Sequence, residues 1–411
     1  MEVKKVTLLK EVVEKAFGRK ILIASDCDSL SKDIYRQTNV KLSLNTLRRF
    51  FNLIKSKYQV SLFTLDLLSR YCGFPSFSEL ADNGEEMQQN SSGNDQGLLN
   101  FLTLLFNDSD VKCINDVTYI NLIHTTIIYL DKKPNIIDQL QRRIAKTLNG
   151  QIFYYEQSVN IDKLDSYYGV GLCYYLNEKR TVEAQIFGNS LLCFRYWLTM
   201  NMEAIKKHHN EILCYTINES VPPSIAGRYF AAQLYFAEAF NREIGSILTQ
   251  AREFYSSIKP SKFIYQDFPA FEYILSEALV LTYQYEEALF YIHEAIKKRN
   301  NKVAPHVDLR LFESIYLNQA IAFANIGREE KSLDILETIT AMNFYFLSRN
   351  FNRILYFSLQ QTIKKRKSVD EQLQYLVEQT GFKKLLVKSM ETIAVVLLVL
   401  TNFQAFGYLV T

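Results

Sequence analysis

The sequence predicts an all-α protein, in which a short basic helical module precedes a long solenoid of antiparallel helix pairs. Three observations predict it. Glycine and proline are scarce, at 14 and 7 of 411 residues, which disfavours loop-rich and disordered chains. From residue 98 onward, apolar side chains recur at helical rather than alternating spacing. The prolines of this region fall between the periodic segments: Pro134, Pro222, Pro223, Pro260, Pro269 and Pro305.

Positive charge is concentrated at the amino end. Residues 1–80 carry 14 Lys and Arg against 8 Asp and Glu, a net charge of +6, whereas the whole chain carries only +3. A basic head on a neutral-to-acidic body is the asymmetry expected when one end meets a polyanion, although chance clustering would give the same count.

The basic module, residues 1–80, has sequence signals for the starts and ends of successive short helices. An amphipathic stretch opens the chain, with apolar positions at Leu8, Leu9, Val12, Val13, Ala16 and Phe17. Ser25 and Asp28 have the spacing of a capping box for a second helix. Asn39 is suited to the turn that follows, and Ser43 is placed to cap a third helix.

The third predicted helix has two distinct faces. Its apolar stripe is Leu47, Phe50, Phe51 and Ile54, which we expect to be buried. Its other face is Asn45, Arg48, Arg49 and Asn52. A helix fits the major groove of DNA, where Arg pairs with guanine and Asn with adenine.

We therefore expect duplex DNA to be a partner, with a division of roles among these residues. Asn45, Arg48 and Arg49 would contact base edges. Lys41, Ser43, Lys55 and Lys57 would bind phosphates and fix the register. The alternative interpretation is a polar face that is simply solvated.

The segment Leu30–Leu80 resembles the Cro/repressor-type helix-turn-helix domain of bacterial regulators. Ser43, Leu47 and Phe50 fit the spacing of the recognition helix, and the segment from Ser61 to Leu80 matches "S-x-x-T-L-x-x-L … G-F-x-S-x-x-E-L". The sequence departs from the family in a turn about two residues longer between the second and third helices. In addition, Tyr35 or Gln37 stands where a small residue is usual.

Beyond the module, residues 81–97 are rich in Asn, Gln, Ser and Gly and predict a flexible linker. Residues 98–391 predict the solenoid. A repeat of 44 residues relates three sets of positions: Ile244, Ala288 and Ser332; Leu248, Ile292 and Leu336; Ala251, Ala295 and Ile339. A further helix pair is predicted over residues 181–215, preceded by an aromatic helix around residues 167–176.

The repeats resemble tetratricopeptide (TPR) helix pairs. Small or apolar residues occupy the first-helix positions, namely Ala232, Leu234, Tyr235, Leu275, Ser276, Leu279, Ala320 and Phe323. The segment Tyr285–Ile296 resembles the second helix of that repeat, and Gly327 marks a turn. TPR units are roughly 34 residues long, so these would be elongated relatives. The resemblance implies a concave face that holds a peptide or a partner protein.

The sequence shows no arrangement for catalysis, a metal or a cofactor, and we expect the protein not to be an enzyme. The six cysteines are scattered, as in reduced core residues of a cytoplasmic protein. His208 and His209 point about 100° apart and are expected at the surface. His124, His293 and His306 are isolated, and Glu286-Glu287 and Glu329-Glu330 suggest solvated helix starts.

Two segments near the carboxyl end remain open to alternatives. The run Lys364–Lys367 is interpreted as a solvated helix end, the alternative being contact with phosphate or an acidic protein. Residues 392–411 are uncharged, and we favour a buried capping helix over a membrane anchor because polar residues interrupt the apolar stretch. An altered reading frame would also fit this change in composition.

Together these patterns predict a cytoplasmic bacterial transcription regulator that binds DNA through residues 1–80. Its solenoid would sense a peptide or protein and could also form a homodimer. The alternative is a non-enzymatic TPR-like interaction scaffold whose helical head does not bind DNA.

Overall fold

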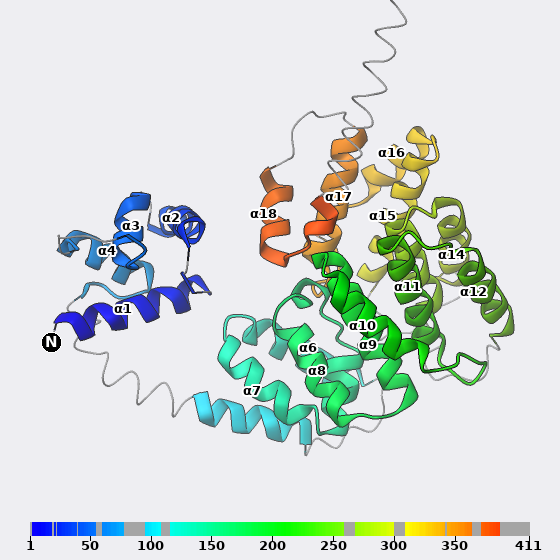
Figure 1. Ribbon diagram of the computed structural model, residues 1–411, viewed down its shortest axis with the longest axis horizontal. Coiled ribbons are helices and arrows are strands. Elements are labelled where there is room, and N and C mark those ends of the chain that lie inside the picture. Colours follow the sequence, from blue (N-terminus) through cyan, green and yellow to red (C-terminus); the bar gives the residue numbers. More distant parts are fainter. Residues whose placement is uncertain are drawn as a thin grey trace, which may run out of the picture. The chain divides into compact units, whose positions relative to one another are not determined.

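In the computed structural model, every regular element among the described residues is a helix (Figure 1). The structure describes residues 2–18, 20–21, 23–38, 40–54, 60–77, 95–107, 116–258, 268–299, 309–341, 343–363 and 371–386. The chain forms two compact units, Met1–Leu102 and Thr103–Thr411. The all-α fold predicted from the sequence is confirmed.

The first unit contains α1 (Glu2–Phe17), α2 (Ala24–Thr38), α3 (Leu44–Phe50) and α4 (Leu62–Tyr71). Helix α1 packs on α4, and α2 packs on both α3 and α4. One apolar core joins the four helices, with Leu9, Val13, Cys27, Leu30, Ile34, Leu47, Phe50 and Leu68 fully or almost fully buried. Burial of this shared core is the main source of stability for such short helices, which are marginal in isolation.

Polar contacts fix how α2 is placed in this unit. The Tyr71 hydroxyl donates to Asp33 Oδ2 at 2.6 Å, and the Ser31 hydroxyl donates to the Leu42 carbonyl at 2.7 Å. Burial of Tyr71 and its bond to Asp33 raise the pKa of the phenol well above its ordinary value. Both contacts join residues that are far apart along the chain, so they hold α2 against α4 and against the turn before α3.

Three of these helices have a side chain that accepts a hydrogen bond from a backbone N–H group at their start. One of the caps predicted from the sequence is wrong. Ser43 and Ser61 accept hydrogen bonds from the backbone N–H groups of Thr46 and Thr64, as the sequence suggested for Ser43. The capping box predicted from Ser25 and Asp28 is not formed, because α2 already begins at Ala24. Asp26 Oδ2 instead accepts from the Ile23 N–H at 3.0 Å.

Helix α4 ends at a left-handed glycine. Gly73 has a φ of 87°. The Phe74 N–H donates to the Ser69 carbonyl at 2.9 Å, and the Gly73 N–H donates to the Arg70 carbonyl at 3.0 Å. This pair of bonds is a Schellman motif, for which only glycine has no steric penalty. It turns Phe74 back onto the core of the first unit.

Part of the predicted linker is helical. Residues 95–107 form a helix, so Asp95, Gln96 and Gly97, which the sequence assigned to the linker, belong to an ordered element. An acid at the first position suits a helix start, and Gln96 Nε2 donates to Asn100 Oδ1 at 2.9 Å across one turn. Residues 81–94 lie outside the described residues.

The second unit begins with α6 (Val117–Leu130), α7 (Pro134–Ile144), the π-helix η1 (Gly150–Glu156), the 3₁₀ helix η2 (Ile161–Lys163) and α8 (Tyr167–Glu178). Five helix pairs follow: α9 (Val182–Thr199) with α10 (Met202–Leu213), α11 (Pro223–Ala239) with α12 (Gly245–Ser257), α13 (Ala270–Leu281) with α14 (Tyr285–Arg299), α15 (Arg310–Asn325) with α16 (Glu329–Thr338), and α17 (Arg349–Ile363) with α18 (Glu371–Thr380). The pair predicted over residues 181–215 and the aromatic helix before it are confirmed.

The first helices of successive pairs pack on one another, from α9 to α11 to α13 to α15. The second helices α12, α14 and α16 carry the positions of the 44-residue repeat. Each of the four first helices ends at a residue with positive φ: Met200, Asn241, Tyr283 and Gly327. The same backbone cap therefore recurs although only one of the four is glycine, which explains why the repeat is faint in the sequence.

The last helix pair returns to the start of the array (Figure 1). The buried carboxylate of Asp162 in η2 accepts from the N–H groups of Asn350 and Phe351, both at 2.9 Å. These are first-turn amides of α17, which have no partner within their own helix. In return, the Asp162 N–H donates to the Leu347 carbonyl at 3.0 Å. A carboxylate nearly 190 residues away thus caps α17.

Apolar and ionic contacts complete this return. The ring of Phe351 lies 5.8 Å from Phe194 in α9 and 6.1 Å from Phe382 beyond α18. Lys384 Nζ lies 2.8 Å from Glu238 Oε1, and the same carboxylate accepts from Trp197 Nε1 at 2.7 Å. The carboxyl-terminal pair is therefore attached to both α9 and α11, beside a pocket that is partly open to solvent.

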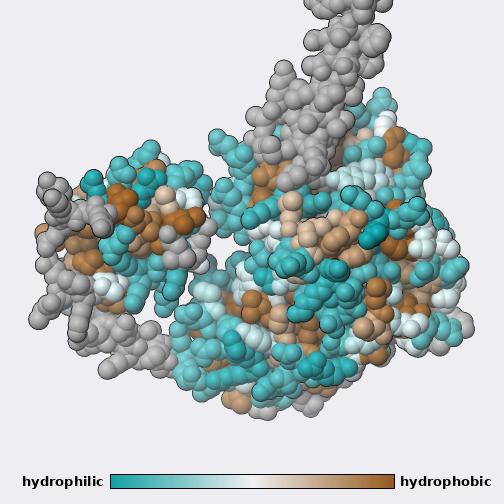
Figure 2. All heavy atoms as spheres, viewed as in Figure 1, coloured by the Kyte–Doolittle hydropathy of each residue, from teal (hydrophilic) through white to brown (hydrophobic). Residues whose placement is uncertain are grey.

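The surface shown in Figure 2 is mostly hydrophilic, with small hydrophobic patches between the polar residues. Scattered exposed apolar side chains of this kind are ordinary for a folded chain. No helix among the described residues is long and apolar enough to cross a membrane. The run Lys364–Lys367 and residues 392–411 lie outside the described residues. Cys27, Cys72, Cys173, Cys193 and Cys214 are unpaired thiols.

Replacing Asp162 by alanine should destabilise the second unit. Two buried N–H groups would lose their acceptor, at a cost of about 1–3 kcal/mol each for groups left unsatisfied. We expect a clear drop in the free energy of unfolding, measured by urea denaturation. The control Glu330→Ala removes an exposed acid from the first turn of α16 and should change it by only a few tenths of a kcal/mol. Equal effects of the two substitutions would contradict this role for Asp162.

Candidate functional site

The polar face of α3 is the first candidate site. Ser43 caps the helix, Leu47 and Phe50 are buried on its inner side, and Asn45 and Arg49 are exposed on its outer side. Residues spaced three and four apart lie on one helix face, so Asn45 and Arg49 are neighbours. The exposed Lys41 lies just before the cap. Lys55 and Lys57 lie outside the described residues.

Arg48 differs from the other two predicted base-contacting residues. Its side chain is half-buried, and its Nε atom is buried without a hydrogen-bond partner among the described residues. Burial raises the pKa of the Cys27 thiol in α2, and the positive charge of Arg48 acts in the opposite direction, so the two side chains are close. The sequence placed Arg48 fully outward, whereas the structure directs its stem toward α2.

The carboxyl end of α3 has a cap that the sequence analysis did not identify. Asn52 has a φ of 60°, and the Leu53 N–H donates to the Arg48 carbonyl at 2.8 Å. Asparagine tolerates the left-handed conformation better than most residues, which is the signal that could have placed this cap. Because α3 ends at Phe50, Asn52 and Ile54 lie beyond it, and Ile54, which the sequence placed on the buried stripe, is exposed.

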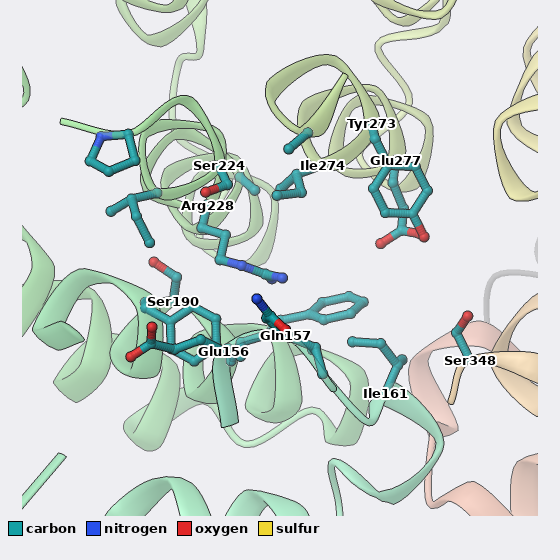
Figure 3. A pocket seen from close by; sticks show the side chains of 18 of the residues that line it. Glu156, Gln157, Ile161, Ser190, Ser224, Arg228, Tyr273, Ile274, Glu277 and Ser348 are labelled. Carbon is teal, nitrogen blue, oxygen red and sulfur yellow. The ribbon is translucent and has the colours of Figure 1, made fainter. Parts of the chain in front are cut away.

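The second candidate site is a pocket of about 410 Å³ inside the second unit (Figure 3). Helices α9, α11 and α13 form its main walls. The segment after η1, α6 and the residues before α17 complete them. The volume is in the range of small-molecule and cofactor sites. The pocket lies on the side of the array lined by the first helices of the pairs, and it is partly open to solvent.

A half-buried cation extends into this pocket. Arg228 projects from α11 toward the centre of the space in Figure 3. Its guanidinium lies 5.2 Å from the ring centroid of Phe187, a cation–π contact. Burial lowers the pKa of Arg228, although a guanidinium remains charged at neutral pH. No described residue forms a hydrogen bond or ion pair with it.

A buried carboxyl group faces the same pocket from α13. Burial raises the pKa of Glu277 to about 7, with the charge of Arg228 acting weakly in the opposite direction. The two groups do not form a direct ion pair among the contacts of the described residues. Glu277 is therefore close to half-ionised at neutral pH, and the pocket keeps an uncompensated positive charge whenever Glu277 is protonated.

The charges at another part of the wall are already satisfied. Lys179 Nζ lies 2.5 Å from Glu156 Oε1, and the Tyr175 hydroxyl donates to the same oxygen at 2.7 Å. By contrast, the hydroxyl of Ser190 in α9 is buried without a hydrogen-bond partner among the described residues. Arg228, Glu277 and Ser190 are thus among the pocket groups with unused capacity for polar contacts. The sequence analysis identified none of them.

Two smaller expectations are corrected. His208 and His209 are not surface residues: His208 Nδ1 lies 2.8 Å from Asn189 Oδ1, and the His209 ring stacks on Phe236 at 3.8 Å. Burial lowers the pKa of both to about 4. Glu287 is not simply solvated, because Arg252 Nη2 donates to it at 2.8 Å. The described residues contain no cluster of three or more His, Cys, Asp or Glu able to hold a metal ion.

Replacing Glu277 by glutamine should stabilise the protein at high pH relative to low pH. The folded-state pKa of about 7 lies above the ordinary glutamate pKa of 4.5, so the stability that the protonated group contributes is fully present below pH 4.5 and is lost as the pH rises through 7. Glutamine does not ionise, so the variant does not lose this stability as the pH rises. The difference in Tm between Glu277→Gln and wild type should increase between pH 5 and pH 8; a constant difference would show that Glu277 titrates normally.

Comparisons of the chain with protein-family models, curated protein sequences and solved structures give no significant match, so the two candidate sites are defined by geometry alone.

Proposed function

We propose that the protein is a DNA-binding transcription regulator whose TPR-like solenoid senses a peptide or protein partner. The observation that carries the proposal is the two-sided α3 helix: it is capped at Ser43, buried on its apolar side, and exposed at Asn45 and Arg49. A short helix with this division of faces is the element that helix-turn-helix proteins insert into the major groove.

The roles of the residues follow from their exposure. Asn45 and Arg49 are free to approach base edges, whereas Lys41 and Ser43, at the start of the helix, are suited to phosphate contacts. Arg48 would contribute its charge from a half-buried position. Ser43 can serve only in part, because its oxygen already accepts from the Thr46 N–H.

The solenoid supplies the sensing element of the proposal. Successive helix pairs of this kind form curved arrays, and the pocket on their concave side is a place for a ligand. A ligand that favoured one curvature would shift the population of solenoid conformations. In a homodimer, that shift would change the spacing of two heads, which must match the helical turn of DNA.

The partial burial of Arg48 favours a second candidate function, a TPR-like interaction scaffold. In that case α3 is a structural part of a helical head that does not bind DNA, and the solenoid is the only binding surface. Duplex DNA binding distinguishes the two functions directly.

Arg49→Ala should weaken binding to duplex DNA. Loss of one Arg contact to a base edge costs about 1–3 kcal/mol, or roughly thirtyfold in affinity at the middle of that range. The measurement is a fluorescence anisotropy titration with fragments selected from a pool of genomic DNA, repeated at several salt concentrations because phosphate contacts give a steep salt dependence.

The matched control is Lys15→Ala, which removes one positive charge from an exposed position on α1 of the same unit. It should leave affinity nearly unchanged. Absence of binding to any duplex at low salt would overturn the regulator proposal and support the scaffold. Equal losses for Arg49→Ala and Lys15→Ala would show that charge alone, and not α3, attracts the DNA.

A further inference from the structure

We propose that the pocket of the second unit binds a ligand with a carboxylate group and an apolar body, and that the carboxylate pairs with Arg228. The inference specifies the ligand chemistry of the proposed sensor and rests on that proposed function. It concerns only residues of the second unit, so ligand binding can be measured separately from DNA binding.

Arg228 carries a positive charge that no ion pair among the described residues neutralises. A buried cation without an ion-pair partner is costly, and proteins usually satisfy such a group with a carboxylate or phosphate. Its guanidinium lies against the face of the Phe187 ring and interacts electrostatically with Glu277, Tyr168, Tyr273 and Tyr235, but no ion pair with it is formed among the described residues. Its N–H groups are directed into the pocket (Figure 3). A planar carboxylate matches this donor fork better than any other common anion of similar size.

A second feature is the shape and polarity of the walls. Apolar side chains surround the cation from three helices and the segment after η1: Phe187, Leu191, Ile225, Ile274 and Ile161. A volume of about 410 Å³ is enough for the aliphatic or aromatic body of a small acid or for a few residues of a peptide. A phosphorylated or highly polar ligand would leave these apolar walls without a matching partner.

A third feature is the Ser190 hydroxyl. It is buried, lines the pocket from α9, and has no hydrogen-bond partner among the described residues. An unsatisfied buried hydroxyl costs about as much as a lost hydrogen bond, so a polar ligand atom beside it is favourable. Arg228 and Ser190 come from different helices and face one space (Figure 3), as expected of groups that meet a single ligand.

A fourth feature is the response of Glu277 to a bound carboxylate. A second negative charge near Glu277 disfavours its ionisation, so the ligand should bind together with a proton. Besides Arg228 and Glu277, the titratable groups that line the pocket are Tyr273, Tyr235, Tyr345, Tyr175, His124, Glu156, Lys179 and Glu183. The first two tyrosines have raised pKa values because they are buried, so they stay neutral between pH 6 and pH 8.

The experiment uses the full chain and isothermal titration calorimetry with decanoate and, as the uncharged counterpart, decanol. Decanoate should bind at one site and decanol at least about tenfold more weakly, since bonds to a charged partner carry that difference. Arg228→Met keeps an unbranched apolar stem, removes the guanidinium and its charge, and should weaken decanoate binding about tenfold or more. Arg142→Met, at an exposed arginine of α7, is the matched control and should bind as wild type.

Two further arms separate the sources of the carboxylate. A library of N-acetylated tetrapeptides built from Val, Leu, Ile and Phe is tested with free carboxyl termini and as carboxyl-terminal amides. Displacement of decanoate by the acids but not by the amides identifies a peptide terminus as the ligand. If decanoate binds but neither the peptide acids nor the peptide amides displace it, the ligand is a small apolar acid.

The pH dependence of decanoate binding keeps the inference testable even if Arg228→Met fails to fold. Decanoate affinity should rise about tenfold between pH 8 and pH 6, because the protonated form of Glu277 becomes dominant. Glu277→Gln should bind about tenfold more tightly than wild type at pH 8 and lose the pH dependence, a gain that misfolding cannot produce. The inference is overturned if decanoate and all acid peptides fail to bind at roughly 1 mM, or if Arg228→Met binds them as wild type does.

Discussion

The second unit depends on one long-range interaction, the capping of α17 by Asp162. First-turn amides of a helix have no intrahelical acceptor and must find one elsewhere. Here the Asp162 carboxylate accepts from Asn350 and Phe351, and the rings of Phe351, Phe194 and Phe382 pack beside that contact. An array of helix pairs without such a contact would end in an open curve. With it, the last pair returns to α9 and the concave side becomes a pocket.

Partial enclosure has an electrostatic consequence. Charges on an open concave face would be hydrated, whereas those inside the pocket are partly removed from water. Burial therefore raises the pKa of Glu277 to about 7 and lowers that of Arg228. Neither change could arise from the two helices that carry these residues, since both residues would be solvated on an isolated amphipathic helix. The chemistry of the pocket is a property of the closed array.

Local features of the fold could be predicted from the sequence, and long-range ones could not. The Ser43 cap and the helix pair over residues 181–215 depend on neighbours within a few positions, and both are present. The partial burial of Arg48 and the burial of His209 depend on which helix packs alongside. The one available signal for the pocket was a lone Arg within the otherwise uncharged stretch from Val221 to Ala237.

Hydrogen–deuterium exchange at the backbone amides of Asn350 and Phe351 tests the central claim most directly. If Asp162 closes the array, these two amides should exchange only when the second unit unfolds, at rates similar to the interior amides of α9. Exchange of both at the rate of exposed first-turn amides, while the interior of α17 remains protected, would show that the helix forms without its remote cap and that the array is open.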